Sequence, residues 1–160
     1  MVFKFIARAL CCCCTKVPKC TNPLPENLNN LEYHDTKVWL PPIQKMKCIK
    51  VCDGDTIVGG CYIYGTAFRF RIRIARCDAP ELHPNVYKNA RQKEYEIQAA
   101  ILSKQAVANI CLGKIITLSN VKTEKWGRLL AEVKVNESGI NISDYLLKHG
   151  LAVPYSGGTK

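Results

Sequence analysis

Carboxylates and arginines stand in a pattern that suits phosphate chemistry with a bound cation. Asp55 follows an Asp-Gly pair, and Asp78 and Glu81 are separated by two residues. Arg73 comes five residues before Asp78, and Arg128 ends a Trp-Gly-Arg sequence. Carboxylate oxygens favour a hard divalent cation such as Ca²⁺ or Mg²⁺. Two arginines can hold a phosphodiester and stabilise the charge that develops on it, while a remaining carboxylate orients or deprotonates water.

The segment 69–74 must position the first of these arginines, and it alternates basic with apolar residues. This period of two predicts a half-buried strand, with Phe70, Ile72 and Ile74 on the core face and the arginines on the other. Arg73 then leaves the core just before the acidic turn. An edge strand that carries only structural ion pairs fits the same segment equally well.

Four further strands are predicted around this one. Asp-Gly and Gly-Thr turn signals separate the first three, and Ile49 and Val51 are expected on one face of the first. The two later strands are apolar runs bounded by glycine and polar residues. The four predicted ranges are 47–53, 57–64, 115–121 and 129–135.

A long helix is predicted over 91–112, with Gly113 as its stop. Five residues recur at helical spacing and are expected to form its core stripe: Tyr95, Ala99, Leu102, Ala106 and Ile110. A short helix over 142–149 is expected to be capped by Asn141 and ended by Gly150. Five strands with a helix between the third and fourth predict an α+β fold, mainly β, that is a five-stranded Greek-key barrel of the OB type.

The order of composition along the chain predicts one folded domain. Residues 1–46 form a cysteine-rich leader and a linker rich in Pro and Asn, 47–155 form the domain, and 156–160 form a tail. The net charge is +10 and the pI is near 9.2. Such a basic chain indicates an anionic partner, either nucleic acid or an acidic membrane surface.

The leader contains four consecutive cysteines: Cys11, Cys12, Cys13 and Cys14. Apolar and basic residues surround them, as at sites of S-acylation, which predicts peripheral membrane attachment. A secretory signal and a disordered leader stay open, although Arg8 interrupts the apolar region. No apolar run approaches the roughly 20 residues of a spanning helix. The remaining cysteines lack paired zinc spacing, so we expect reduced thiols and an intracellular protein, with secretion as the alternative.

Three motifs occur in a fixed order along the domain. They are Asp53-Gly54-Asp55-Thr56, then Arg73 with Asp78-Ala79-Pro80-Glu81, then Lys125-Trp126-Gly127-Arg128-Leu129. From about residue 47 to 152 the sequence resembles the staphylococcal nuclease (thermonuclease) family. The resemblance implies the five-stranded OB barrel with helices. It also implies a hydrolase, a calcium-dependent endonuclease that cleaves DNA and RNA and leaves 3′-phosphates.

The resemblance assigns roles to individual residues. One calcium ion would be held by Asp55, Asp78 and the main-chain carbonyl of Ala79, where the family often has threonine. Glu81 would act on the attacking water as base or positioner, and Arg73 and Arg128 would contact the scissile phosphate. The candidate substrate contacts are Lys125, Trp126 and Tyr155. The chain ends soon after Tyr155, without the long final helix of the bacterial enzymes.

A non-catalytic module is the alternative function: an OB barrel that holds nucleic acid or a protein ligand without cleaving it. A relative without activity is expected to lose an acid or an arginine of the motifs, and this chain keeps them all. Asp53 is interpreted as a turn former, and Arg69, Arg71 and Arg76 as a phosphate-attracting surface. We expect a monomer with no protein partner.

Overall fold

The computed structural model describes residues 34, 40–84, 89–124 and 127–156. The chain divides into two compact units, Met1–Thr36 and Lys37–Lys160, and the fold below is that of the second unit. The predicted leader with its four consecutive cysteines lies outside the described residues.

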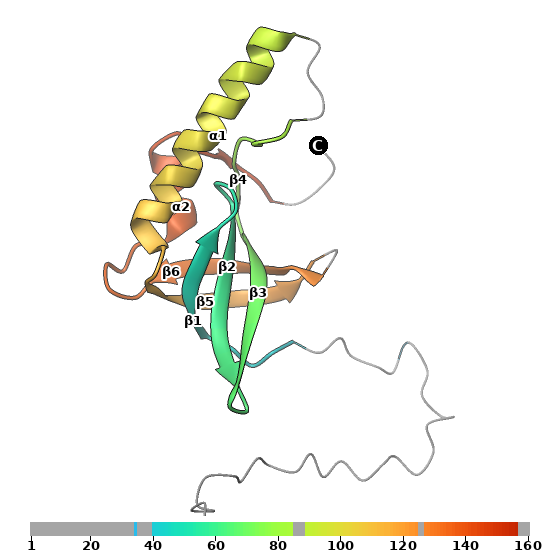
Figure 1. Ribbon diagram of the computed structural model, residues 1–160, viewed down its shortest axis with the longest axis vertical. Coiled ribbons are helices and arrows are strands. Elements are labelled where there is room, and N and C mark those ends of the chain that lie inside the picture. Colours follow the sequence, from blue (N-terminus) through green and yellow to red (C-terminus); the bar gives the residue numbers. More distant parts are fainter. Residues whose placement is uncertain (1–33, 35–39, 85–88, 125–126, 157–160) are drawn as a thin grey trace, which may run out of the picture. The chain divides into compact units, whose positions relative to one another are not determined.

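Five strands form a closed barrel, as expected from the sequence (Figure 1). They are β1 (Lys45–Val51), β2 (Thr56–Ile63), β3 (Thr66–Ile74), β5 (Ile115–Thr123) and β6 (Leu129–Val135). Their order around the barrel is β1-β2-β3-β6-β5, with β1 and β5 paired to close it. β3 and β6 run parallel and the other pairs are antiparallel. The α+β OB-type barrel is thereby confirmed.

The barrel interior is filled by the inward face of each strand. Ile72 and Ile74 are fully buried, as the alternation in β3 predicts. Phe70, further from the barrel centre, is only partly buried. β6 alternates in the same way, with Ala131 and Val133 fully buried. A period of two therefore identified the core residues of these strands correctly.

The expectation that Ile49 and Val51 share one face is wrong. Cys48 pairs with Gly59 and Lys50 pairs with Val58, so the register shifts by one residue within β1. Such a β-bulge adds one residue to a strand and turns the following side chains. Ile49 continues the outward positions of Lys45 and Lys47 and is 48% exposed, whereas the bulge returns Val51 to the core.

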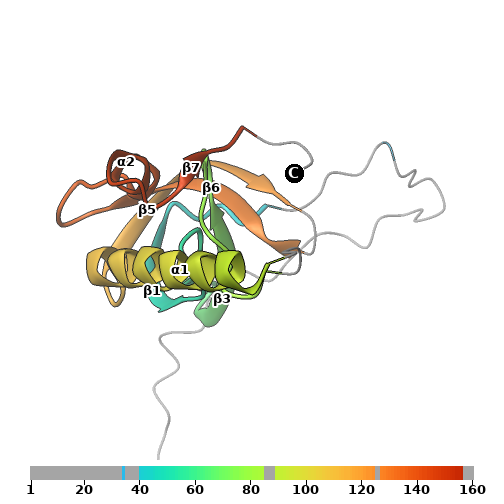
Figure 2. The same ribbon diagram turned by 90° about the horizontal axis from the view of Figure 1, so that it is seen from above.

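The predicted core stripe of the long helix α1 (Ala90–Cys111) is confirmed at Ile110 and wrong at two other positions. Tyr95 and Leu102, expected in this stripe, are 60% and 59% exposed. Only the C-terminal half of α1 lies against the barrel, and the N-terminal half extends beyond it (Figures 1 and 2). The buried residues of this half are Ala100, Ser103, Val107, Ile110 and Cys111. Small side chains here let the helix approach the β1–β2 turn closely.

Two short elements complete the fold. The helix α2 (Ile142–Lys148) is capped by Asn141 as predicted, whose side chain accepts from the backbone N–H of Asp144. The two-residue strands β4 (Cys77–Asp78) and β7 (Val153–Pro154) pair with each other and were not predicted. A pair of residues carries no periodicity, so only the fold brings these segments together.

The described cysteines are all free thiols: Cys48, Cys52, Cys61, Cys77 and Cys111. Cys48 and Cys111 are fully buried with their sulfur atoms 3.6 Å apart, and join β1 to the end of α1. Burial raises the pKa of Cys77 to about 12, so this thiol stays protonated. In the described part of the chain, no helix is long and apolar enough to cross a membrane.

Candidate active site

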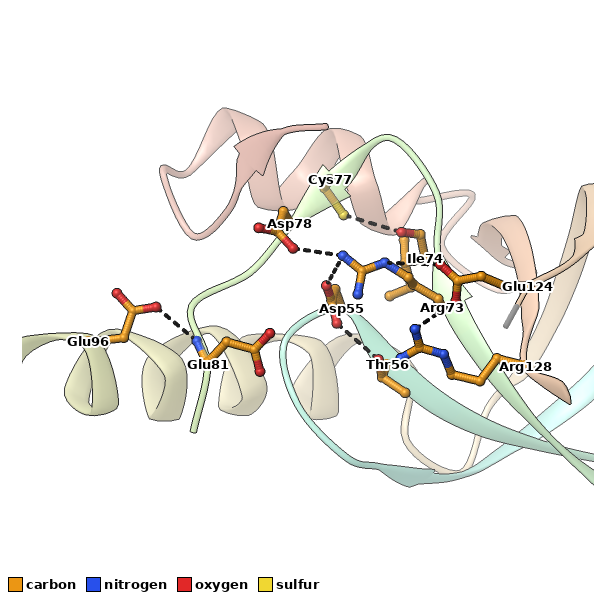
Figure 3. Close-up of polar contacts among 10 residues, drawn as sticks. All are labelled: Asp55, Thr56, Arg73, Ile74, Cys77, Asp78, Glu81, Glu96, Glu124 and Arg128. Carbon is orange, nitrogen blue, oxygen red and sulfur yellow. Dashed lines mark hydrogen bonds and ion pairs between the residues drawn. The ribbon is translucent and has the colours of Figure 1, made fainter. Parts of the chain in front are cut away.

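The ends of β2, β3 and β4 bring the first two motifs together (Figure 3). Asp55 directly precedes β2, and the register pairs Thr56 with Arg73 of β3. The backbone N–H of Ile74 donates to the carbonyl of Asp55 at 2.8 Å. Asp78 lies in β4, which the pairing with β7 holds beside the barrel end. Strand pairing alone therefore places two predicted metal ligands around one predicted phosphate contact.

Gly54 permits the close packing behind Asp55. A Cβ atom on Gly54 would overlap the side chain of Ser103 in α1 and lie 2.7 Å from the Cβ of Ala79. Ala79, a predicted metal ligand through its carbonyl, is itself only 5% exposed. The glycine and alanine of the two motifs are thus neighbours, and the spatial contact explains why a small residue stands at each position.

Arg73 is held by three carboxylates. Its Nη2 lies 3.0 Å from Asp55 Oδ2 and donates to Asp78 Oδ1 at 2.7 Å. Its Nε lies 4.0 Å from Glu124 Oε1. Burial, the largest single influence, acts to lower the pKa of Arg73, but the three carboxylates together outweigh it and raise the pKa. The guanidinium is charged and fixed in position.

Asp55 lies in an environment that opposes its charge. Burial raises its pKa to about 6, and the nearby Asp53 adds to the rise, while Arg73 and a 2.9 Å hydrogen bond from Thr56 Oγ1 oppose it. Within the described residues, Asp53 Oδ1 is buried and has no hydrogen-bond partner. The interpretation of Asp53 as a turn former therefore missed an electrostatic role, which the Asp-x-Asp spacing could have indicated.

The donor chemistry of this region fits a hard divalent cation. Asp55 and Asp78 present carboxylate oxygens to one guanidinium nitrogen, and Asp53 adds a buried oxygen without a partner. Hard oxygen donors and excess buried negative charge are what Ca²⁺ requires. In this structure Arg73 takes the place between the two carboxylates. Among the described residues, no group of three His, Cys, Asp or Glu side chains is arranged to hold a metal ion.

Glu124 connects the two predicted catalytic arginines and was missed by the sequence prediction. Beyond its contact with Arg73, its Oε2 lies 2.8 Å from Arg128 Nη2. This second contact is an ion pair without hydrogen-bond alignment, since that oxygen and Arg128 Nε both lack a hydrogen-bond partner among the described residues. Arg128 therefore keeps a buried donor for another acceptor. The four-residue spacing of Glu124 and Arg128 was a usable signal.

Glu81 lies on the segment that follows β4, apart from the ion pairs of Arg73. Its backbone N–H donates to Glu96 Oε1 of α1 at 3.0 Å, and its carboxylate extends toward the Asp55 loop (Figure 3). Glu81 and Asp53 line a hollow of about 850 Å³. Arg73 lines a separate hollow of about 630 Å³ that shares no residue with the first.

Tyr155 is the one predicted substrate contact that the structure describes. The Arg73 guanidinium lies over its ring, 5.6 Å from the centroid, and the Tyr155 N–H donates to the carbonyl of Arg76. The β4–β7 pairing thus carries the C-terminal segment to the site. Arg76 donates to Ser143 and Asp144 of α2, so it links structural elements rather than forming a free phosphate-attracting group. The other two predicted contacts, Lys125 and Trp126, lie outside the described residues.

Comparison with known proteins agrees with the fold and the order of the motifs. The family described as staphylococcal nuclease homologue matches residues 71–159, which are 89 of the 160 residues. The match covers Arg73, Asp78, Glu81 and Arg128 and begins after Asp55. A comparison with curated proteins gives no match. With more than half of its length matched and with the five-stranded barrel in place, the chain belongs to the staphylococcal nuclease homologue family.

Proposed function

We propose that the chain is a calcium-dependent endonuclease that hydrolyses phosphodiester bonds of DNA and RNA and leaves 3′-phosphates. The observation that carries this proposal is the largely buried Arg73, with its side chain 13% exposed, which lies within ion-pair distance of both Asp55 and Asp78. Structural ion pairs on a barrel surface do not require this burial, and removing a guanidinium from water is costly unless several carboxylates surround it. Function gives a reason for keeping such a cluster.

The proposed roles are those that the family resemblance implies, and the ion pairs of Arg73 with Asp55 and Asp78 support them. Asp55, Asp78 and the Ala79 carbonyl are proposed to hold the Ca²⁺. When bound, the ion supplies positive charge next to the phosphate. Arg73 and Arg128 donate to the equatorial phosphate oxygens, where charge grows during attack. Because the carboxylates that would hold the ion also hold Arg73, this arginine has to exchange partners before it contacts the phosphate.

Glu81 is proposed to act on water. It accepts a proton as the water oxygen bonds to phosphorus, and the bond from phosphorus to the 5′ oxygen breaks. The products are a 3′-phosphate and a 5′-hydroxyl, with the leaving oxygen protonated from solvent. The exposed position of Glu81 beside a hollow supports this role, since water and substrate can both reach it.

The experiment uses the purified full-length chain with 5′-labelled single-stranded DNA and RNA, in Ca²⁺ or in excess chelator. We expect cleavage with Ca²⁺ only, products that become slower in a gel after phosphatase treatment, and loss of cleavage in Asp78→Asn. Glu137→Gln, which removes one exposed acid from the β6–α2 turn, is the control and should cleave normally. Full cleavage in chelator would overturn the calcium assignment. Binding without cleavage in Ca²⁺ would establish the non-catalytic module instead.

A further inference from the structure

The outer face of β1, β2 and β3 carries a row of cations that the proposed chemistry does not use. Lys50, Val58 and Arg71 are neighbours across the three strands. Strands lie about 4.8 Å apart, so two cations flank one apolar residue at roughly 10 Å. Two residues further along, Arg69 pairs with Gly60 on the same face. Ile49, which follows Lys45 and Lys47 on the outward side of β1, lies against Gly60.

This face is hollowed rather than flat. The hollow of about 850 Å³ that contains Glu81 is also lined by Lys50, Arg71 and Lys104 of α1. A second hollow of about 960 Å³ is lined by Lys45, Lys47, Tyr62 and Phe68, among others. Ile49 and Arg69 line both, so the two hollows meet at these side chains. We call the two together the outer groove, which begins at Glu81 and ends at Tyr62.

The charge of the outer groove is one-sided. Its cations are Lys45, Lys47, Lys50, Arg69, Arg71 and Lys104. Among the described residues the ion pairs fall on Arg73, Arg76 and Arg128, so none of these six is paired. Asp53 and Glu81 lie at the catalytic end, and no acidic side chain of the described residues lines the second hollow. The groove is therefore complementary to a polyanion.

The floor of the groove distinguishes between polyanions. Ile49 is 48% exposed and Tyr62 80%, and both lie on the outer face, since Tyr62 is two residues from Gly60. A duplex keeps its bases stacked inside and presents mainly phosphates, so it leaves such a floor uncovered. A single strand offers unstacked bases that can lie on aromatic side chains while its phosphates meet the cations. A membrane surface cannot enter a hollow of this size, although it can attract the same charges.

Given the hydrolysis proposed above, we propose that the outer groove is a second binding site, for the single-stranded part of a nucleic-acid substrate beyond the scissile phosphate. The strand runs from Glu81 over Ile49 to Tyr62, with its phosphates beside the lysines and arginines. Affinity then grows with substrate length, over a range of about 4–16 nucleotides for one OB barrel. A substrate too short to leave the catalytic end gains nothing from the groove.

The test measures binding by the full-length protein, in chelator so that nothing is cleaved. The probes are labelled thymidine oligomers of 2 and 20 nucleotides and a 20-base-pair duplex. The variant is Lys50→Glu combined with Arg71→Glu. Its control is Lys93→Glu combined with Lys134→Glu, which makes the same change in net charge at exposed positions outside the groove.

We expect the groove variant to bind the 20-nucleotide strand at least about tenfold more weakly, with the slope of log affinity against log salt reduced by roughly 1.4 for two lost phosphate contacts. The control should bind the strand within about twofold of the wild type, because salt screens exposed charges that lie far from the bound strand. Equal losses in both variants, or an equal loss for the dinucleotide, would overturn the proposal.

A second pair of variants tests the floor. Tyr62→Ala should weaken binding of the 20-nucleotide strand about tenfold, as expected for a lost base stack. The duplex should be bound as before. Tyr95→Ala, which removes a 60% exposed ring from α1, is the matched control. Because Tyr62 and Tyr95 are both exposed, folding is preserved, and circular dichroism verifies it. No change in strand affinity would reject the floor as a base platform.

Two further measurements distinguish a strand-binding groove from a membrane-binding face and separate strand binding from hydrolysis. The first measures binding to vesicles that contain phosphatidylserine. If the groove variant binds these vesicles more weakly than the wild type but binds the 20-nucleotide strand equally well, the face is a membrane surface and the proposal is wrong. If the protein never cleaves nucleic acid but still binds the long strand through the groove, the proposed hydrolysis fails and the binding site stands. If both groove variants cleave normally and bind the strand as the wild type does, the hydrolysis stands and the binding site is rejected.

Discussion

Arg71 and Arg73 stand two residues apart on the same face of β3, yet their surroundings differ completely. Arg73 has a side chain 13% exposed and contacts three carboxylates. Arg71 is exposed and, among the described residues, has no ion pair. A buried guanidinium with fixed partners can be aimed at a reacting group, whereas an exposed one only supplies charge. Two arginines on one strand thus have different roles, and the difference in the exposure of their side chains accounts for it.

The largest expected effect concerns the carboxylate beside the buried cluster. Glu81→Gln keeps size and hydrogen bonding but cannot take a proton, so we expect cleavage to fall by about 10²–10⁴. Glu94→Gln, an exposed residue on α1, is the matched control. Single-turnover rates at saturating enzyme measure both. A nearly normal rate in Glu81→Gln would show that another group is the base. The outer groove, which begins at Glu81, would then not begin at the catalytic base.

Asp55, which contacts the largely buried Arg73, gives rise to a predicted pH effect on stability. The pKa of Asp55 in the fold is about 6, above its unfolded value of about 3.9. A raised pKa means that the folded state binds the proton more tightly, so this contribution to stability is complete below pH 4 and is lost as the pH rises through 6. The loss is on the order of 3 kcal/mol. Asp55→Asn should remove the charge and so raise the free energy of unfolding at pH 7 in chelator.

Urea unfolding of wild type and Asp55→Asn at pH 4, 5.5 and 7 measures this. The difference between the two proteins should grow with pH, and Ca²⁺ at pH 7 should stabilise only the wild type. Glu137→Gln, in the exposed turn between β6 and α2, is the control for removal of an acid. A variant less stable than the wild type at pH 7 would show that the Arg73 pair outweighs the burial of Asp55.

Close packing behind the cluster gives a smaller, purely structural effect. Gly54→Ala introduces a Cβ into Ser103 and Ala79, and we expect a loss of about 1–3 kcal/mol in the free energy of unfolding. Adding Ser103→Ala should recover part of it. Gly60→Ala, on the outer face, meets Ile49 at 3.4 Å and the Phe68 carbonyl at 3.8 Å, and should change stability far less. Equal losses at both glycines would contradict the tight approach of α1.

Changes to the leader cysteines are expected to have the smallest effect on the stability and activity of the folded domain. We propose that Cys11, Cys12, Cys13 and Cys14 carry acyl chains, two or more of which are needed for stable membrane attachment. Replacing all four with serine should move the protein from the membrane to the soluble fraction of cells. Cys20→Ser is the single-residue control. An unchanged distribution, with no acyl groups detected by thiol exchange, would reject the anchor.

Local patterns predicted the barrel because each strand buries one face. The alternation in β3 and the turn residues around it are encoded within a few positions, and the structure confirmed them. The prediction failed where a distant segment decides. Ile49 and Val51 lie on opposite faces because a bulge in the pairing with β2 stands between them, and α1 packs through Ser103, which lies close to Gly54.

The site was predictable in its residue types but not in its connections. Asp55, Arg73 and Asp78 were named from their motifs and lie within ion-pair distance. Glu124 was missed because its contact with Arg73 spans 51 residues of sequence, and Asp53 because an Asp-Gly turn explained it without any charge. The pairing of β4 with β7, which brings Tyr155 to Arg73, has no local signal at all.

The most direct test is the single-turnover cleavage rate of Arg73→Lys, measured over a range of enzyme concentrations. Lysine keeps the charge and loses the second parallel donor, so the maximal rate should fall by about 10²–10³ with nucleic-acid binding largely kept. Arg128→Lys should behave alike, and Arg91→Lys at the exposed start of α1 should match the wild type. Lys50→Glu with Arg71→Glu should instead raise the enzyme concentration needed for half the maximal rate. An Arg73→Lys enzyme whose maximal rate equals that of Arg91→Lys would contradict the assignment of the buried arginine to the active site.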